Sequence, residues 1–343
     1  MYRKILDFLE NWKESKHRKP LILQGARQVG KTYSILEFGR THYENVAYFN
    51  FETNPKLNKT FEENISPDYL LPILSHIAGQ TIVKEKTLIV FDEIQLCERA
   101  LTSLKYFCED APEYHIIVAG SLLGVAVNRT RFSFPVGKVD MKTLYPMDME
   151  EFMLALDESA LVNQIKKCFE TDTPMPSALH DAAMQLYRQY LVVGGMPECV
   201  LQFRETKDYV LVRHTQDTIL ASYLNDMSKY NNLNEIKKTR LAYDNITVQL
   251  SKKNTRFQYK LLKKGGRASE FENAIEWLCL SGIVSQVYKV EQIKKPLENY
   301  RDIDSFKIYV SDLGLLCAKK DLTATDILYM VEELNDFKGG MAE

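Results

Sequence analysis

The chain lacks the features that mark membrane, zinc-binding or disulfide-bonded proteins. Its apolar runs, such as YHIIVAG and YLVVGG, are far too short to span a bilayer. Its six cysteines are widely scattered without a C-x-x-C pair, so we expect the reduced thiols of a cytoplasmic protein. Its six histidines form no ligand pair at helical spacing, which argues against zinc. The net charge of -2 gives no overall attraction to nucleic acid or membrane, so any such surface must be local.

The composition is that of an ordinary globular protein with a sizeable core. The chain has 343 residues, of which 45% are hydrophobic and 26% are charged, enough for about two or three domains. Its first residues, MYRKILDFLENWK, carry Asp7 and Glu10 within an apolar pattern of helical spacing. Carboxylates inside that pattern predict an amphipathic helix and argue against a signal peptide.

Residues 25–32 read GARQVGKT and fit the pattern G-x-x-x-x-G-K-T of a phosphate-binding loop. The apolar run PLILQ before it predicts a buried strand, and KTYSILEFG predicts a helix with Gly39 as its C-cap. The helix N-terminus and the loop amides then face the phosphates, Lys31 reaches the β- and γ-phosphates, and Thr32 ligates Mg²⁺. The residues predicted to contact the nucleotide are Gly25, Ala26, Arg27, Gln28, Val29, Gly30, Lys31, Thr32 and Tyr33.

A second motif, TLIVFDEIQ at residues 87–95, places two adjacent carboxylates after an apolar strand. A strand that is apolar at nearly every position is buried on both faces, as in parallel α/β sheets. Such sheets bind their ligands at the carboxyl ends of the strands. We therefore expect Asp92 to hold Mg²⁺ through water and Glu93 to polarise the attacking water.

Strand and helix patterns alternate over residues 1–155, which we predict to form a three-layer α/β domain with a parallel sheet. After the fourth strand, the segment A-G-S places Ser121 between the γ-phosphate and the catalytic water. The same serine also suits the N-cap of a following helix. The candidate strands are residues 20–24, 46–51, 87–91, 115–119 and 139–144.

The rest of the chain has two regions with different predicted secondary structure. Residues 156–235 have mostly helical patterns, introduced by a capping box of Asp148 and Glu151 and broken at TDTPMPS and GGMP. Over residues 236–325, three predicted helices precede two strand-like segments, IVSQVYKV and SFKIYVSD, which is the order of a winged helix-turn-helix. The second of these helices is predicted from FQYKLLKKGG, and the third from a capping box of Ser269 and Glu272.

One segment of this winged-helix-like region is strongly basic. Residues 252–267 hold seven Lys or Arg and no acid, with Phe257 and Tyr259 interleaved, which predicts contacts to DNA phosphates. The third helix carries several glutamates, which do not suit a helix that reads bases in a major groove. A solvated basic face or a protein-docking surface is the alternative. The candidate DNA contacts are Lys252, Lys253, Arg256, Lys260, Lys263, Lys264 and Arg267.

The motifs together resemble a family of prokaryotic AAA-type ATPases, related to the STAND and archaeal-type ATPases, whose C-terminal region is uncharacterised. The P-loop is generic, whereas D-E-I-Q, A-G-S-L-L-G, P-M-x-x-E-E-F and D-L-G-L-L in this order are specific. The matching stretches cover nearly the whole chain and are LQGARQVGKTY, IVFDEIQ, IVAGSLLG, SFPVGK, LYPMDMEEF, VGGMPE and YVSDLGLL.

The resemblance implies an AAA-type core with strand order 5-1-4-3-2, a helical lid at residues 156–235, a winged helix and often a nuclease-like tail. It implies that Ser121 senses the γ-phosphate. It also implies an arginine supplied in trans, for which Arg129 and Arg131 are the candidates, and hence a homo-oligomer or a protein partner. Each of these arginines is as readily an ordinary surface residue.

The chain departs from that family in two places. Many members have Gly-Arg where this chain has Gly137 followed by Lys138, so the role of that arginine does not carry over. Residues 326–343, which end in FKGGMAE, resemble the entrance to the tail domain, so we expect the nuclease-like part to be absent.

The sequence therefore predicts Mg²⁺-dependent binding and hydrolysis of ATP, coupled to the winged-helix-like region. ATP is favoured over GTP because the guanine-reading N-K-x-D is missing: Asn58 and Lys59 are followed by Thr60 and Phe61. The alternative is a slow nucleotide-gated switch that controls a protein partner. A small-molecule kinase would need a basic acceptor-binding lid after the third strand, where CERALTSLKYFCED predicts a packing helix instead.

Overall fold

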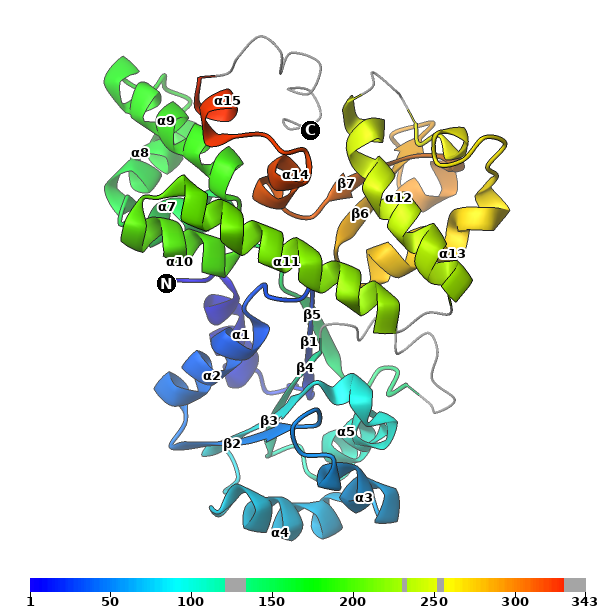
Figure 1. Ribbon diagram of the computed structural model, residues 1–343. Helices are drawn as coiled ribbons and strands as arrows, with labels where there is room; N and C mark the ends of the chain where they lie inside the picture. The colour runs from blue at the N-terminus through cyan, green and yellow to red at the C-terminus, as the bar shows by residue number, and fades with distance from the viewer. Residues whose placement is uncertain (121–133, 230–232, 252–255, 330–343) are drawn as a thin grey trace. The chain divides into compact units, whose positions relative to one another are not determined.

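The computed structural model describes residues 1–120, 134–229, 233–251 and 256–329 (Figure 1). The chain divides into two compact units, residues 2–145 and residues 146–343, with Met1 grouped with the second. We call them the core unit and the C-terminal unit. In the described ranges, no helix is both long enough and apolar enough to cross a bilayer.

The core unit is built on a 5-stranded parallel sheet in the order β2-β3-β4-β1-β5. This is the predicted order 5-1-4-3-2, so the three-layer α/β P-loop fold is confirmed. The strands are β1 (Leu21–Gln24), β2 (Asn45–Asn50), β3 (Thr87–Asp92), β4 (His115–Gly120) and β5 (Asp140–Thr143), and the helices are α1 (Ile5–Glu14), α2 (Lys31–His42), α3 (Lys56–Glu63), α4 (Pro67–Ala78) and α5 (Glu98–Asp110).

Strand β3 is buried at every residue because helices cover both faces of the sheet. Its odd-numbered residues, Ile89 and Phe91, belong to one hydrophobic cluster with residues of α3, α4 and α5. Leu88 faces the other side, where α2 packs. The apolar sequence of this strand therefore carries its two carboxylates to the carboxyl edge of the sheet, beside the start of α2.

Gly39 is not the C-cap predicted for α2, because the helix continues to His42. The glycine instead allows α2 to approach the sheet closely. A Cβ atom at this position would lie 2.5 Å from a side-chain methyl of Val46 and 3.1 Å from one of Leu88. The close approach holds the helix that begins at the phosphate-binding loop firmly on its strand.

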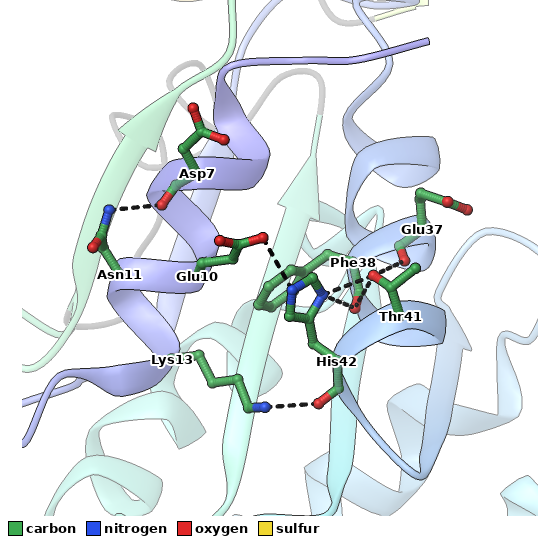
Figure 2. A network of polar contacts seen from close by, with 8 residues as sticks. All are labelled: Asp7, Glu10, Asn11, Lys13, Glu37, Phe38, Thr41 and His42. Carbon is green, nitrogen blue, oxygen red and sulfur yellow. Dashed lines mark hydrogen bonds and ion pairs between the residues drawn. The ribbon is translucent and has the colours of Figure 1, made fainter.

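The C-terminal end of α2 is tied to α1 by polar contacts around His42 (Figure 2). The imidazole lies 3.1 Å from the Glu10 carboxylate, and the Lys13 ammonium donates to the His42 carbonyl at 2.7 Å. The ring of His42 also stacks on Phe38, with 4.6 Å between centroids. A cation that bonds the last carbonyls of a helix also opposes the negative end of its dipole, so Lys13 stabilises α2.

The C-terminal unit is mainly helical and contains a single antiparallel pair of strands in its described part, β6 and β7. The helix-breaking GGMP segment lies between α9 and α10, and the predicted capping box of Asp148 and Glu151 opens α7. The elements are α7 (Met149–Ala155), α8 (Ser159–Glu170), α9 (Ser177–Val193), α10 (Pro197–Thr206), α11 (Tyr209–Lys229), α12 (Leu233–Ser251), α13 (Ala268–Leu280), β6 (Val284–Val290), β7 (Arg301–Val310), α14 (Leu313–Lys319) and α15 (Ala324–Leu328).

Two predictions between α12 and β6 are wrong. The segment FQYKLLKKGG forms only a short 3₁₀ turn, Tyr259–Leu261, because Phe257 pairs with β7 instead. Its amide donates to the Phe306 carbonyl at 2.7 Å, and the two rings stack with 5.5 Å between centroids. The expected Ser269 cap is also not formed, because α13 begins two residues earlier than that cap predicts, with Arg267 at its N-cap and no side-chain cap.

A buried carboxylate explains the VGGMPE and SDLGLL motifs. Asp312 caps α14 by accepting from the Leu315 amide at 2.8 Å, and it also accepts from the Gly195 amide at 2.6 Å. A Cβ on Gly194 would lie 2.3 Å from the Asp312 carboxylate, and one on Gly314 would lie 2.5 Å from the Val193 carbonyl. Only glycine fits such distances, so the two motifs form one packed junction.

We expect Asp312→Ala to lower the free energy of unfolding by about 1–3 kcal/mol, since buried backbone amides lose their acceptor. Burial raises the pKa of Asp312 from 3.8 to about 6. A raised pKa in the folded state gives stability that is present at low pH. This stability is lost as pH rises from 3.8 through about 6. The loss on substitution should therefore be larger at pH near 4 than at pH near 7, as measured by urea unfolding.

The matched control is Asp217→Ala, which removes an exposed carboxylate from α11 of the same unit. Substitution of such an exposed residue usually changes the free energy of unfolding by less than about 0.5 kcal/mol. Equal losses in the two variants would show that the buried junction is not a special source of stability.

Candidate functional site

The loop between β1 and α2 has the backbone of a phosphate-binding loop. Gly25 has φ 147° and Gly30 has φ 90°, values that L side chains rarely adopt. A Cβ on Gly25 would lie 2.1 Å from the Leu144 carbonyl, so the close passage of β5 also requires glycine there. Gln28 takes a left-handed φ of 66°, and α2 begins at Lys31. The loop is therefore shaped to turn its amides toward an anion at the start of α2.

Lys31 lies at the centre of this loop. Its ammonium donates to the carbonyls of Gly25 at 2.9 Å and Ala26 at 2.7 Å, and the side chain is only 8% exposed. Burial lowers the pKa of Lys31 to about 8, against the opposing effect of the nearby Glu93 and Asp92 carboxylates. A desolvated ammonium held by two neutral carbonyls is a strong site for a phosphate group, whose charge would compensate the burial.

Asp92 lies beside the first residue pair of α2. Its Oδ2 atom accepts from the Thr32 hydroxyl at 2.9 Å, and its Oδ1 atom accepts from the Glu93 amide at 2.9 Å. The fold thus brings together the hydroxyl and the carboxylate that the sequence assigned to the metal. Mg²⁺ prefers such hard oxygen ligands, takes one or two from protein and keeps several waters, so Thr32 and Asp92 fit it.

Tyr48 is a member of this site that the sequence analysis missed. Its hydroxyl donates to the same Oδ2 atom of Asp92 at 2.7 Å, and it accepts from the Asn50 amide at 3.2 Å. Burial raises the pKa of Tyr48 to about 12, which keeps the hydroxyl protonated as a donor. The available signal was its position on β2, two residues before the strand ends, on the strand that pairs with β3.

Glu93 lies directly after β3 and is half-buried. Its backbone is left-handed, with φ 52°, a conformation that is uncommon for residues other than glycine, asparagine and aspartate. The carboxylate accepts a short hydrogen bond from the Gln95 amide. Burial is the main cause that raises the pKa of Glu93, and the Gln95 hydrogen bond opposes it. A perturbed carboxylate beside a phosphate-binding lysine is typical of a catalytic centre.

Arg3, just before α1, supports the loop and was also missed. Its guanidinium is 4% exposed and donates to the Val29 carbonyl at 2.9 Å and the Tyr145 carbonyl at 2.7 Å. The side chain thus joins the phosphate-binding loop to the segment after β5. Its sequence position, in a basic stretch before an amphipathic helix, gave no indication of this role.

Several predicted site residues lie outside the described residues. They are the sensor candidate, the two arginine-finger candidates and the first two basic residues of the DNA segment: Ser121, Arg129, Arg131, Lys252 and Lys253. Strand β4, which precedes the first of them, lies between β1 and β3 as predicted. No group of three or more His, Cys, Asp or Glu side chains placed to hold a metal occurs in the ranges that the structure covers.

In the basic segment of the C-terminal unit, most of the described cations are exposed, but one forms an ion pair within the unit. Arg256, Lys260, Lys264 and Arg267 are exposed, whereas Lys263 forms an ion pair of 2.7 Å with Glu270 of α13. Phe257, 6% exposed, packs inside the unit, so its ring does not form a platform for stacking bases.

Two family models match separate parts of the chain. Residues 17–153 match the model of an AAA domain, and residues 184–326 match a domain of unknown function, DUF8612. The first match spans the strands and both motifs described above. The core unit therefore has an α/β P-loop fold and is similar to AAA domains over these residues. No curated protein matches the chain at a significant level.

Solved structures with similar folds include AAA-type proteins of low identity. RuvB of Thermotoga maritima is 14% identical with a TM-score of 0.37, over 82% of this chain and 87% of that chain. ORC1 of Aeropyrum pernix, solved in complex with DNA, is 12% identical with a TM-score of 0.32, over 93% and 91%. C. elegans PCH-2 is 10% identical with a TM-score of 0.33, and the match spans 60% of this chain and 63% of that one. Overlap at this level says nothing about function.

Proposed function

We propose that the core unit binds ATP with Mg²⁺ and hydrolyses it. The observation that carries the proposal is the buried Lys31 ammonium inside the loop, next to the Thr32–Asp92 pair and the perturbed Glu93. The loop amides and Lys31 would bind the phosphates, and Thr32 and Asp92 would hold the metal. Bound Mg²⁺ would neutralise charge on the phosphate oxygens. ATP is preferred to GTP because the chain has no N-K-x-D motif.

The reaction itself needs little covalent chemistry from the protein. Glu93 would accept a hydrogen bond from the attacking water and orient it, and Tyr48 would keep Asp92 in place. Ser121 would sense the γ-phosphate, and Arg129 or Arg131 would act on a neighbouring copy of the chain or on a partner. Turnover should then rise with protein concentration, because the arginine is supplied in trans.

We further propose that nucleotide state is coupled to the C-terminal unit, with residues 236–325 acting as a winged-helix module on DNA. The exposed cations between residues 256 and 267 support this proposal. The Lys263–Glu270 ion pair and the buried Phe257 favour the second candidate, a slow nucleotide-gated switch that controls a protein partner. ATPase rate measured against protein concentration, with and without duplex DNA, separates them. A switch gives near-single-turnover behaviour that DNA does not change.

If DNA binds this segment, we expect contacts to phosphates rather than to bases. The association constant should then vary little with the DNA sequence. It should fall by about 0.9 log units per phosphate contact for each tenfold increase in salt concentration. Lys263→Ala with Lys264→Ala should flatten the slope by up to about two such units, with Lys264 contributing more because Lys263 is paired with Glu270.

The control for this double variant is Lys166→Ala with Lys167→Ala on α8. It too is an adjacent lysine pair of which one member is paired, Lys166 with Glu150 at 2.5 Å. The salt dependence of binding is measured by fluorescence anisotropy on two unrelated duplexes. If the Lys263 and Lys264 variant binds like the parent at every salt concentration, the basic segment does not contact DNA.

A further inference from the structure

Glu93 is positioned by the short turn that follows it. The 3₁₀ turn Ile94–Leu96 is anchored by Ile94, which is 0% exposed. The Leu96 amide donates to the Glu93 carbonyl at 3.0 Å, and the Cys97 amide donates to the Ile94 carbonyl at 2.9 Å. These bonds hold Glu93 in its left-handed backbone conformation. Residues in such conformations persist where the surrounding structure determines them strongly, often at active sites.

The same turn aims Gln95 back at the Glu93 carboxylate. Its Nε2 atom donates to Glu93 Oε2, the one side-chain hydrogen bond to this carboxylate in the described part of the chain. Gln95 therefore fixes one carboxylate oxygen and leaves the other free for a hydrogen from water.

The other end of the Gln95 amide carries a cost. Among the described residues, its Oε1 atom is buried without a hydrogen-bond partner, and so is Oδ1 of Asn58, whose amide donates to the Leu96 carbonyl at 3.5 Å. A buried acceptor without a donor destabilises a fold, and such atoms in native proteins call for an explanation. An apolar side chain of the same length would remove this cost. The amide thus serves Glu93 rather than the stability of the turn.

We propose that Gln95 is a positioning residue of the hydrolytic reaction, whose amide holds the Glu93 carboxylate in the orientation that receives the attacking water. The inference rests on the proposed function, in which Glu93 orients that water. It assigns the glutamine of the D-E-I-Q motif a role in the reaction rather than in packing. The role is indirect, because Gln95 acts through the Glu93 carboxylate.

The test is Gln95→Met, which keeps the length of the side chain and removes the donor. We expect kcat to fall about 10- to 100-fold, the value of one hydrogen bond to a charged group. ATP affinity should be unchanged, and the thermal midpoint should stay the same or rise.

Two further variants complete the experiment. In a Glu93→Gln background, Gln95→Met should cause no additional loss, because the carboxylate it positions is gone. Leu96→Ala, on the same turn and 39% exposed, controls for disturbance of the turn and should leave kcat unchanged.

The outcomes separate the two proposals. If the parent does not hydrolyse ATP, the proposed function fails, whatever Gln95 does. If the parent hydrolyses ATP and Glu93→Gln turns over equally fast, the role of Glu93 fails and the role of Gln95 fails with it. If Glu93→Gln is impaired and Gln95→Met is not, the positioning role is overturned. A Gln95→Met variant that loses thermal stability and activity together, and loses activity by the same factor in the Glu93→Gln background, overturns it equally, because a packing role predicts that result.

Discussion

Replacing Lys31 with alanine is expected to abolish the rise in melting temperature that ATP and Mg²⁺ give the parent protein. A ligand at about 100 times its Kd stabilises a folded protein by about 2.7 kcal/mol, which is a readily measured shift. Lys31 provides the buried positive charge at the centre of the loop. Without it, the loop loses its buried ammonium while the Asp92 and Glu93 carboxylates remain close to the phosphates, so binding should become too weak to detect.

The shift must be compared within each variant, because the substitution also removes two hydrogen bonds from the nucleotide-free protein. Lys16→Ala is the control, since Lys16 is exposed in the same unit. The pKa of Lys31, lowered to about 8 by burial, adds a second expectation. Affinity of the parent for ATP should decline as pH rises above that value, because the ammonium loses its proton. Equal shifts in Lys31→Ala and parent would place the nucleotide elsewhere.

The second large effect is expected for Glu93→Gln. The substitution keeps the shape of the side chain and removes the charge that orients water, so turnover should fall by about 10²–10⁴-fold. Binding of ATP should persist, because the loop and Lys31 are untouched. Nucleotide-dependent thermal shift and steady-state release of phosphate measure the two properties on the same sample.

Glu52→Gln provides the matched control for this variant. Glu52 is exposed and follows β2, the neighbouring strand, so it tests whether any carboxylate at this edge of the sheet affects turnover. We expect it to behave like the parent. Unchanged kcat in Glu93→Gln would remove Glu93 from the mechanism.

Sequence periodicity predicted the core unit well because its strands are buried on both faces and its loop is fixed by spacing. The strand order and the neighbourhood of Lys31, Thr32 and Asp92 followed from two motifs and a rule about sheet edges. Tyr48 and Arg3 were missed because their roles depend on contacts between residues far apart in the chain, which no local pattern records.

The errors have the same origin. The segment after residue 256 has a helical composition, yet Phe257 gains more from stacking on Phe306 of β7 than from a helical turn. Gly39 is a good helix terminator by propensity, yet the nearby Val46 required a residue without a side chain inside the helix. In both cases tertiary contact overrode local preference.

The two carbonyls that accept hydrogen bonds from Lys31 compete with any anion for the same ammonium group. A monovalent ion such as chloride would have to displace them and could offer the ammonium little that it does not already have. A polyphosphate differs, because it engages the loop amides, the start of α2 and a metal at the same time. The loop should therefore select ligands by the number of simultaneous contacts rather than by charge alone. Simple monovalent anions should bind it only weakly.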